Sequence, residues 1–205
     1  MAANNPFRSF AIAMLFSTIA HASLLGAMIM RHAIISAVLC GLTLIASADE
    51  ERTPVPLVFA SPLGAFYFRL VPSSDFDEEN AKGFLYRVSD EGDELLYQSN
   101  GWYSFTVLVS NNGAYLARTG PWPRFDSPPE STSAVVFYAD GVPVRTYFVA
   151  DLVDDLSKLQ YSESHYGWGG SLRWRTEEQW KGEVEVKTVE NKTIRFNIQT
   201  AEIVN

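Results

Sequence analysis

The chain has 205 residues, of which 24 are acidic and 16 basic, so its formal net charge is −8. An acidic surface argues against binding to nucleic acid and against docking on anionic lipid, because phosphates must be met by lysine and arginine. The single cysteine, Cys40, excludes a disulfide within the chain, so the fold must be held by its hydrophobic core.

Near the N-terminus, a basic pair precedes an uncharged apolar run that ends in a box of small residues. Arg31-His32 is the pair, Ala46-Ser47-Ala48 is the box, and acidic residues follow at once. This order is typical of a secretory signal peptide cleaved after Ala48. A membrane-spanning helix needs about 20 apolar residues, and this run is shorter. We therefore predict a signal peptide at residues 30–48 and a protein exported to the periplasm or the cell exterior.

Residues 10–30 form a second, mostly apolar run that is long enough to span a membrane. Either translation begins at Met28 or Met30 and residues 1–29 are an upstream extension, or both runs are made and residues 10–30 tether the protein to the membrane. In the first case residues 49–205 form a single exported domain of 157 residues. Its net charge is −10, because the removed segment holds two basic and no acidic residues.

From residue 57 to residue 149, apolar and polar residues alternate with period two, which is typical of half-buried strands. Short turns such as Asn111-Asn112-Gly113 and Asp140-Gly141 connect them, and no segment has the length of a crossover helix. We therefore predict a mainly β fold of antiparallel sheets, arranged as a sandwich, a barrel or a partial propeller. The expected strands are Leu57–Ala60, Ala65–Val71, Gly83–Val88, Glu94–Ser99, Phe105–Ser110, Ala114–Arg118, Ala134–Ala139 and Val142–Val149.

Two connections and one helix interrupt this pattern. The acidic run Ser74–Asn80 has oxygen ligands suited to Ca²⁺ but lacks the spacing of an EF-hand, so we expect a solvated loop. Residues 120–133 contain four prolines, which exclude a central strand. A single short α-helix is expected over Ala150–Gln160, because its apolar residues fall on one face. Asp151 is placed to cap its first turn.

The C-terminal segment reads as a β-hairpin. Residues 183–187 and 194–199 alternate between apolar and polar side chains, and the turn is Glu190-Asn191-Lys192. One face of this pair is therefore expected to cover a core while the other faces solvent.

Two consecutive segments resemble the strand pairs in blades of secreted β-propellers of the WD40-like and TolB-like kind. They are VLVSNNGAYLARTG at residues 107–120 and VVFYADGVPVRTYFVADL at 135–152, and GFLYRVSDEGDELLYQS at 83–99 is a looser match. The whole run also resembles a group of uncharacterised secreted bacterial proteins. The resemblance implies a fold of blade-like hairpins and brings no activity with it. Since a propeller needs four or more blades, the domain either adopts another β architecture or completes itself with another chain.

The segment around His165 carries the candidate chemistry. His165 with Glu163, or with Asp151, has the residue types of a general base and an orienting carboxylate, as in a hydrolase. One histidine and no cysteine in the exported chain exclude the usual zinc sets, so no metal and no cofactor are predicted.

Aromatic residues in loops and at strand ends are the other candidate site, because such rings stack on sugars or on a partner's side chains. We predict a non-enzymatic binding module that contacts a glycan or an envelope protein. The alternative is a hydrolase that acts on an exported polymer and uses His165 with Glu163. The predicted ligand-binding residues are Tyr166, Trp168, Trp174 and Trp122.

Overall fold

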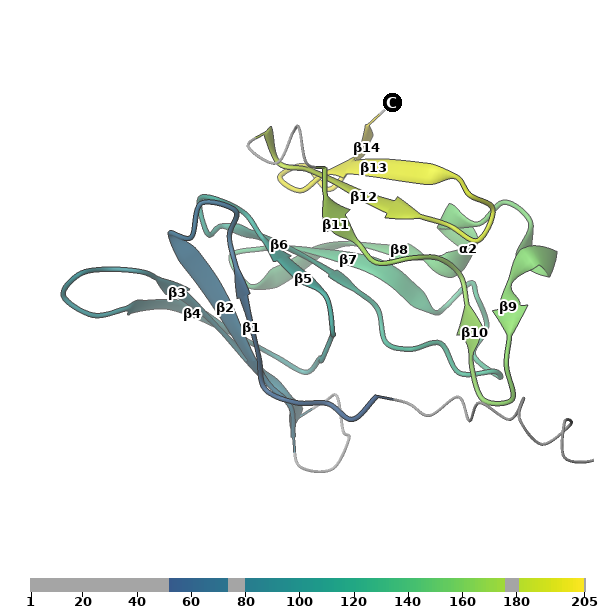
Figure 1. Ribbon diagram of the computed structural model, residues 1–205, viewed down its shortest axis with the longest axis horizontal. Helices are drawn as coiled ribbons and strands as arrows, with labels where there is room; N and C mark the ends of the chain where they lie inside the picture. Colours follow the sequence, from purple (N-terminus) through teal and green to yellow (C-terminus); the bar gives the residue numbers. More distant parts are fainter. Residues whose placement is uncertain (1–51, 74–79, 176–180, 205) are drawn as a thin grey trace, which may run out of the picture. The chain divides into compact units, whose positions relative to one another are not determined.

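The computed structural model describes residues 52–73, 80–175 and 181–204 (Figure 1). These residues belong to one compact unit, Asp49–Asn205. The predicted signal peptide, the upstream extension and residues 74–79 of the acidic run lie outside the described residues. Within the described ranges, no helix has the length and apolar character needed to cross a membrane.

The predicted mainly β fold with antiparallel sheets is confirmed. Three four-stranded sheets follow one another along the chain, and in each of them consecutive strands are neighbours. We call them the N-terminal sheet (β1–β4), the central sheet (β5–β8) and the C-terminal sheet (β11–β14). The described strands do not close into a barrel. The strands are β1 Leu57–Ala60, β2 Phe66–Val71, β3 Lys82–Arg87, β4 Glu94–Asn100, β5 Val107–Val109, β6 Tyr115–Thr119, β7 Ser133–Ala139, β8 Val142–Phe148, β9 Gln160–Tyr161, β10 Tyr166–Gly167, β11 Arg173–Trp174, β12 Glu183–Lys187, β13 Thr193–Asn197 and β14 Ile203–Val204.

The turns that join these strands use the residues expected for them. Asp140 and Gly141 both have positive φ, 48° and 80°, which is the backbone of the tightest hairpin turns. Asn191, in the predicted C-terminal turn, has φ 63°. The register of that hairpin pairs Val184 with Phe196, so its apolar residues share one face, as predicted.

Both faces of the central sheet are buried, and each face supports a separate hydrophobic core. Along β7, Val136 and Tyr138 point to one side while Val135 and Phe137 point to the other. The N-terminal core joins the first side to the N-terminal sheet, and its buried residues are Phe68, Leu70, Ala81, Leu85, Trp102, Tyr103, Val107, Val109, Leu116, Val136 and Tyr138. The C-terminal core joins the second side to the C-terminal sheet, and its buried residues are Ala117, Ala134, Val135, Phe137, Tyr147, Val149, Leu152, Val153, Leu159, Tyr166, Trp168, Leu172, Val184, Val186, Ile194, Phe196, Ile198 and Ala201.

The predicted helix over Ala150–Gln160 is present only in part. The chain forms α2, Val149–Leu152, and a 3₁₀ turn η3, Leu156–Lys158, with extended backbone at Val153 between them. Asp151 contributes at the start as expected, because its Oδ2 accepts a hydrogen bond from the Phe148 N–H at 2.8 Å.

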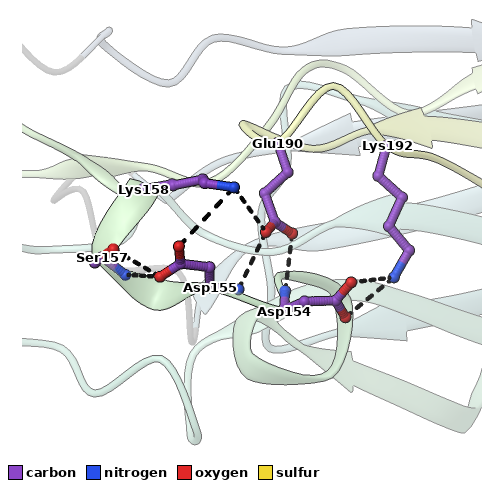
Figure 2. A network of polar contacts seen from close by, with 6 residues as sticks. All are labelled: Asp154, Asp155, Ser157, Lys158, Glu190 and Lys192. Atoms are coloured by element: carbon purple, nitrogen blue, oxygen red, sulfur yellow. Dashed lines mark hydrogen bonds and ion pairs between the residues drawn. The ribbon is translucent and has the colours of Figure 1, made fainter.

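A side chain from the C-terminal hairpin interrupts the helix (Figure 2). The Glu190 carboxylate accepts hydrogen bonds from the N–H groups of Asp154, at 2.8 Å, and Asp155, at 3.1 Å. Those two amides would otherwise bond to carbonyls one turn earlier in the helix. The Asp155 side chain then caps η3 by accepting from the Ser157 N–H at 3.1 Å. The helix is therefore shorter than predicted because of a tertiary contact, which the local pattern of apolar residues does not reveal.

Candidate ligand-binding cleft

A cleft of about 390 Å³ opens where four chain segments meet, and clefts of this volume hold small ligands or single units of polymers. The segments are the first described residues, the loop between β4 and β5, the end of β6 with the proline-rich loop, and the loop between β10 and β11. The lining residues are Arg52, Pro54, Tyr103, Ser104, Phe105, Thr106, Thr119, Gly120, Pro121, Trp122, Pro123, Trp168, Gly169, Gly170 and Ser171.

Trp122 forms an exposed aromatic wall of this cleft. The residue is 41 % exposed, and its ring stacks on that of His165 with centroids 4.8 Å apart. Backbone bonds on both sides hold the loop: Tyr166 N–H donates to Pro123 O at 3.0 Å, and Phe125 N–H donates to Ser164 O at 2.8 Å. The His165 ring and the backbone hydrogen bonds thus hold the Trp122 indole in place without a ligand.

Residues 52–56 form another part of the cleft wall, which we call the strap. Tyr103 holds the strap in place. The Tyr103 hydroxyl donates to Val55 O at 2.7 Å and accepts from Val55 N–H at 3.1 Å. Three residues earlier, the Arg52 guanidinium lies over the Phe105 ring, 4.8 Å from its centroid. Tyr103 and Phe105 meet edge to face at 5.1 Å, so the strap rests on an ordered aromatic pair.

Small and hydroxyl-bearing residues shape the remaining wall. Thr119 Oγ1 lies 3.0 Å from Ser104 Oγ, which also donates to Thr106 O at 2.9 Å. Next to them, a Cβ placed on Gly120 would lie 1.7 Å from the carbonyl oxygen of Ser133. Only glycine allows this close approach of the end of β6 to the start of β7.

The predicted aromatic residues fall into two groups. Trp122 and Trp168 come together in the cleft, although Trp168 is only 7 % exposed. Tyr166 is 1 % exposed in the C-terminal core, where burial raises the pKa of its hydroxyl. Trp174, in β11, lines a separate cavity of about 190 Å³.

None of the residues predicted for hydrolysis is among the cleft's lining residues, and His165 adjoins the cleft through its contact with Trp122. His165 is 7 % exposed, and its Nδ1 is 2.7 Å from the hydroxyl of Ser164. Glu163 is exposed, and the Asp151 carboxylate is engaged at the start of α2. No three histidine, cysteine, aspartate or glutamate side chains gather as a metal site in the described segments.

Sequence reasoning missed three contributors to the cleft: Tyr103 as the tie for the strap, Phe105 as the support for Arg52, and Arg52 itself. Tyr103 has a visible signal, since it is one of several aromatic residues outside the clearest strands. Arg52 has none, because its position depends on a contact between residues 48 apart in the chain.

No protein-family model matches this chain, and a search of curated proteins found no match. The function of the cleft must therefore be inferred from its own residues.

Proposed function

We propose that the protein is an exported glycan-binding module whose ligand occupies the cleft, with a sugar ring stacked on Trp122. The observation that supports this most is the half-exposed indole of Trp122, held from behind by His165 at the cleft. An aromatic face that is already ordered binds a flat apolar ring face at a low entropic cost. The hydroxyl groups and backbone of the other wall offer partners for a polar ligand.

A glycan fits the cleft better than an envelope protein does. A stable protein interface buries roughly 1,200–2,000 Å² in total, far more than a small cleft offers. A volume of about 390 Å³ instead suits a short section of a chain-like ligand.

Binding is also better supported than hydrolysis. A general base must reach the reacting proton directly or through one water. The His165 ring has one face against Trp122, is mostly buried and has its Nδ1 within hydrogen-bond distance of Ser164. These contacts suit a side chain that supports Trp122.

The test is a fluorescence titration of the intrinsic tryptophan signal against soluble β-glucan, chitin and galacturonan oligosaccharides. We expect saturable binding to at least one oligosaccharide and a loss of at least about tenfold in affinity in Trp122→Ala. Phe125→Ala is the matched control, because Phe125 is an exposed aromatic residue of the same loop that does not line the cleft. No saturable response, or equal binding by Trp122→Ala, would reject the proposal.

The hydrolase alternative is checked with the same oligosaccharides. We expect no new reducing ends during prolonged incubation with the purified protein. If the wild-type protein releases reducing ends and His165→Ala does not, the protein is a hydrolase and the proposal of a non-enzymatic binding module is rejected.

Export is tested separately by mass spectrometry of the N-terminus of protein recovered from its natural source. Cleavage after Ala48 predicts a chain that begins at Asp49. A chain that retains residues 10–30 would instead indicate a membrane tether.

A further inference from the structure

We infer that the ligand of this cleft is an acidic glycan whose carboxylate is bound by Arg52, an inference that rests on the proposed function and narrows it to one class of sugar. The first step is the charge of the cleft. Among the described residues that line it, Arg52 carries the only full charge at neutral pH, in a chain with a net charge of −8. An anionic ligand is repelled by most of this protein and attracted here, so the arginine confers selectivity as well as affinity.

The second step is the availability of the Arg52 side chain. Arg52 is exposed, and no carboxylate within the described ranges forms an ion pair with it. Its guanidinium carbon lies 4.8 Å from the centroid of the Phe105 ring, and a cation–π contact of this kind does not itself use the N–H donors in hydrogen bonds. Those donors form the planar fork that matches the two oxygens of a carboxylate.

The third step is order. Val55 is bound to the Tyr103 hydroxyl by two hydrogen bonds, and Arg52 is stacked on Phe105 three residues earlier. The guanidinium therefore loses little freedom when a ligand arrives. Tyr103 is a positioning residue in this scheme, since it holds the strap that carries Arg52.

Together, the cleft presents one aromatic platform, Trp122, and one cation, Arg52, on separate segments of the chain. A sugar unit with an apolar ring face and a carboxylate satisfies both. A neutral sugar satisfies only Trp122.

The experiment compares trigalacturonic acid with its methyl ester, which keeps the rings and removes the charge. By isothermal titration calorimetry we expect wild-type protein to bind the acid at least tenfold more tightly than the ester. Arg52→Gln is expected to lose most of this preference and to keep its affinity for the ester. Arg52→Lys is expected to fall between them, because lysine keeps the charge without the planar fork.

Three further measurements separate recognition from a general effect on the fold. Affinity for the acid, and not for the ester, is expected to fall as salt rises from 50 to 500 mM, because salt screens the ion pair. Arg69→Gln is the matched control, because Arg69 is an exposed arginine of β2 outside the cleft. Tyr103→Phe is expected to weaken binding of the acid more than binding of the ester.

The outcomes distinguish this inference from the proposed function. Equal affinity of wild-type protein for acid and ester, with binding still dependent on Trp122, overturns the acidic ligand and leaves glycan binding intact. Equal loss of acid and ester binding in Arg52→Gln also overturns it. Absence of any Trp122-dependent binding rejects both.

Discussion

The two cores on opposite faces of the central sheet share the strand β7 but are built differently. The buried residues of the C-terminal core are aliphatic and aromatic, and Phe137 and Phe196 lie among them with ring centroids 5.4 Å apart. The N-terminal core has a charged side chain beside it: Arg118, 9 % exposed, lies against the rings of Trp102 and Tyr138. The same sheet thus packs against uncharged side chains on one side and beside a buried cation on the other.

The buried cation is tolerated because its surroundings satisfy it. Arg118 Nε donates to the Tyr138 hydroxyl at 2.9 Å, and Nη1 donates to Thr119 O at 3.2 Å. The guanidinium carbon is 4.8 Å from the Trp102 ring centroid, a favourable cation–π distance. Trp102 in turn donates its indole N–H to Ser99 Oγ at 2.9 Å. The difference between the cores teaches that one is filled by uncharged side chains alone, whereas the other also holds a cation whose N–H groups need partners.

The largest expected effect tests the dependence of the C-terminal core on volume. Phe196→Ala removes a fully buried ring that contacts Phe137 and Tyr147, and should lower the free energy of unfolding by about 3–5 kcal/mol. Urea denaturation followed by far-UV circular dichroism measures it. Phe196→Leu, which keeps most of the volume, should cost much less. Equal costs for the two variants would contradict a volume-dependent core.

The second effect tests polar satisfaction in the N-terminal core. Arg118→Ala removes the cation, its stacking and the donor to Tyr138, and should cost about 2–3 kcal/mol of unfolding free energy. Arg118→Met restores much of the apolar contact and avoids burying a charge, so it should cost about 1 kcal/mol or less. The two variants are compared in the same urea assay. A methionine variant as unstable as the alanine variant would mean that the charge itself stabilises this core.

The third effect concerns the rim of the C-terminal core, where Glu190 binds the amides of Asp154 and Asp155. Glu190→Ala leaves both amides without this acceptor and should cost about 1–2 kcal/mol. Glu202→Ala is the control, since it removes an exposed ion pair with Arg145, and the typical value of such a pair is about 0–1 kcal/mol. Thermal unfolding of the three proteins ranks them. If the control variant has as low a melting temperature as Glu190→Ala, the hydrogen bonds from Glu190 to the two amides contribute no more than an exposed ion pair does.

The smallest effect depends on pH and involves Asp155. Hydrogen bonds from the Ser157 side chain and backbone hold the pKa of Asp155 below its ordinary value. The stabilisation is therefore present above the unfolded pKa of about 4 and is lost as pH falls through the lower pKa of the folded state. The difference in urea midpoint between wild type and Asp155→Ala should shrink on acidification from pH 7 to below pH 3. If the difference in urea midpoint stays constant across this pH range, the stabilisation by Asp155 comes from packing and not from its charge.

The sheets were predictable because their signals are local. The eight expected strands between residues 57 and 149 are all present, since alternation and turn residues act over a few positions. Seven differ from the prediction by at most one residue at either end, and β5 is half as long as predicted. The uninterrupted apolar run of β7 also agrees with a strand covered on both faces. By contrast, β9, β10, β11 and β14 have two residues each, too few to show a period.

The early end of the helix and half of the cleft were not predictable, because their causes lie far away in the chain. Glu190 is 35 residues from the amide of Asp155 that it binds, and Tyr103 is 48 residues from Val55. Trp122 and Trp168 were accessible to prediction, since prolines and glycines beside them mark loops where an aromatic residue is unusual. The propeller-like resemblance stays a prediction.

The strand β7 bonds to β6 on one side and β8 on the other, and side chains cover both of its faces. Its backbone amides can therefore exchange their hydrogens for deuterium only when the whole domain opens. The strand β4 pairs only with β3 in the described part of the chain, and its residues 94–96 are exposed. In hydrogen exchange followed by mass spectrometry, peptides covering residues 134–138 should be the last to gain mass, and their exchange rate should report the stability of both cores at once.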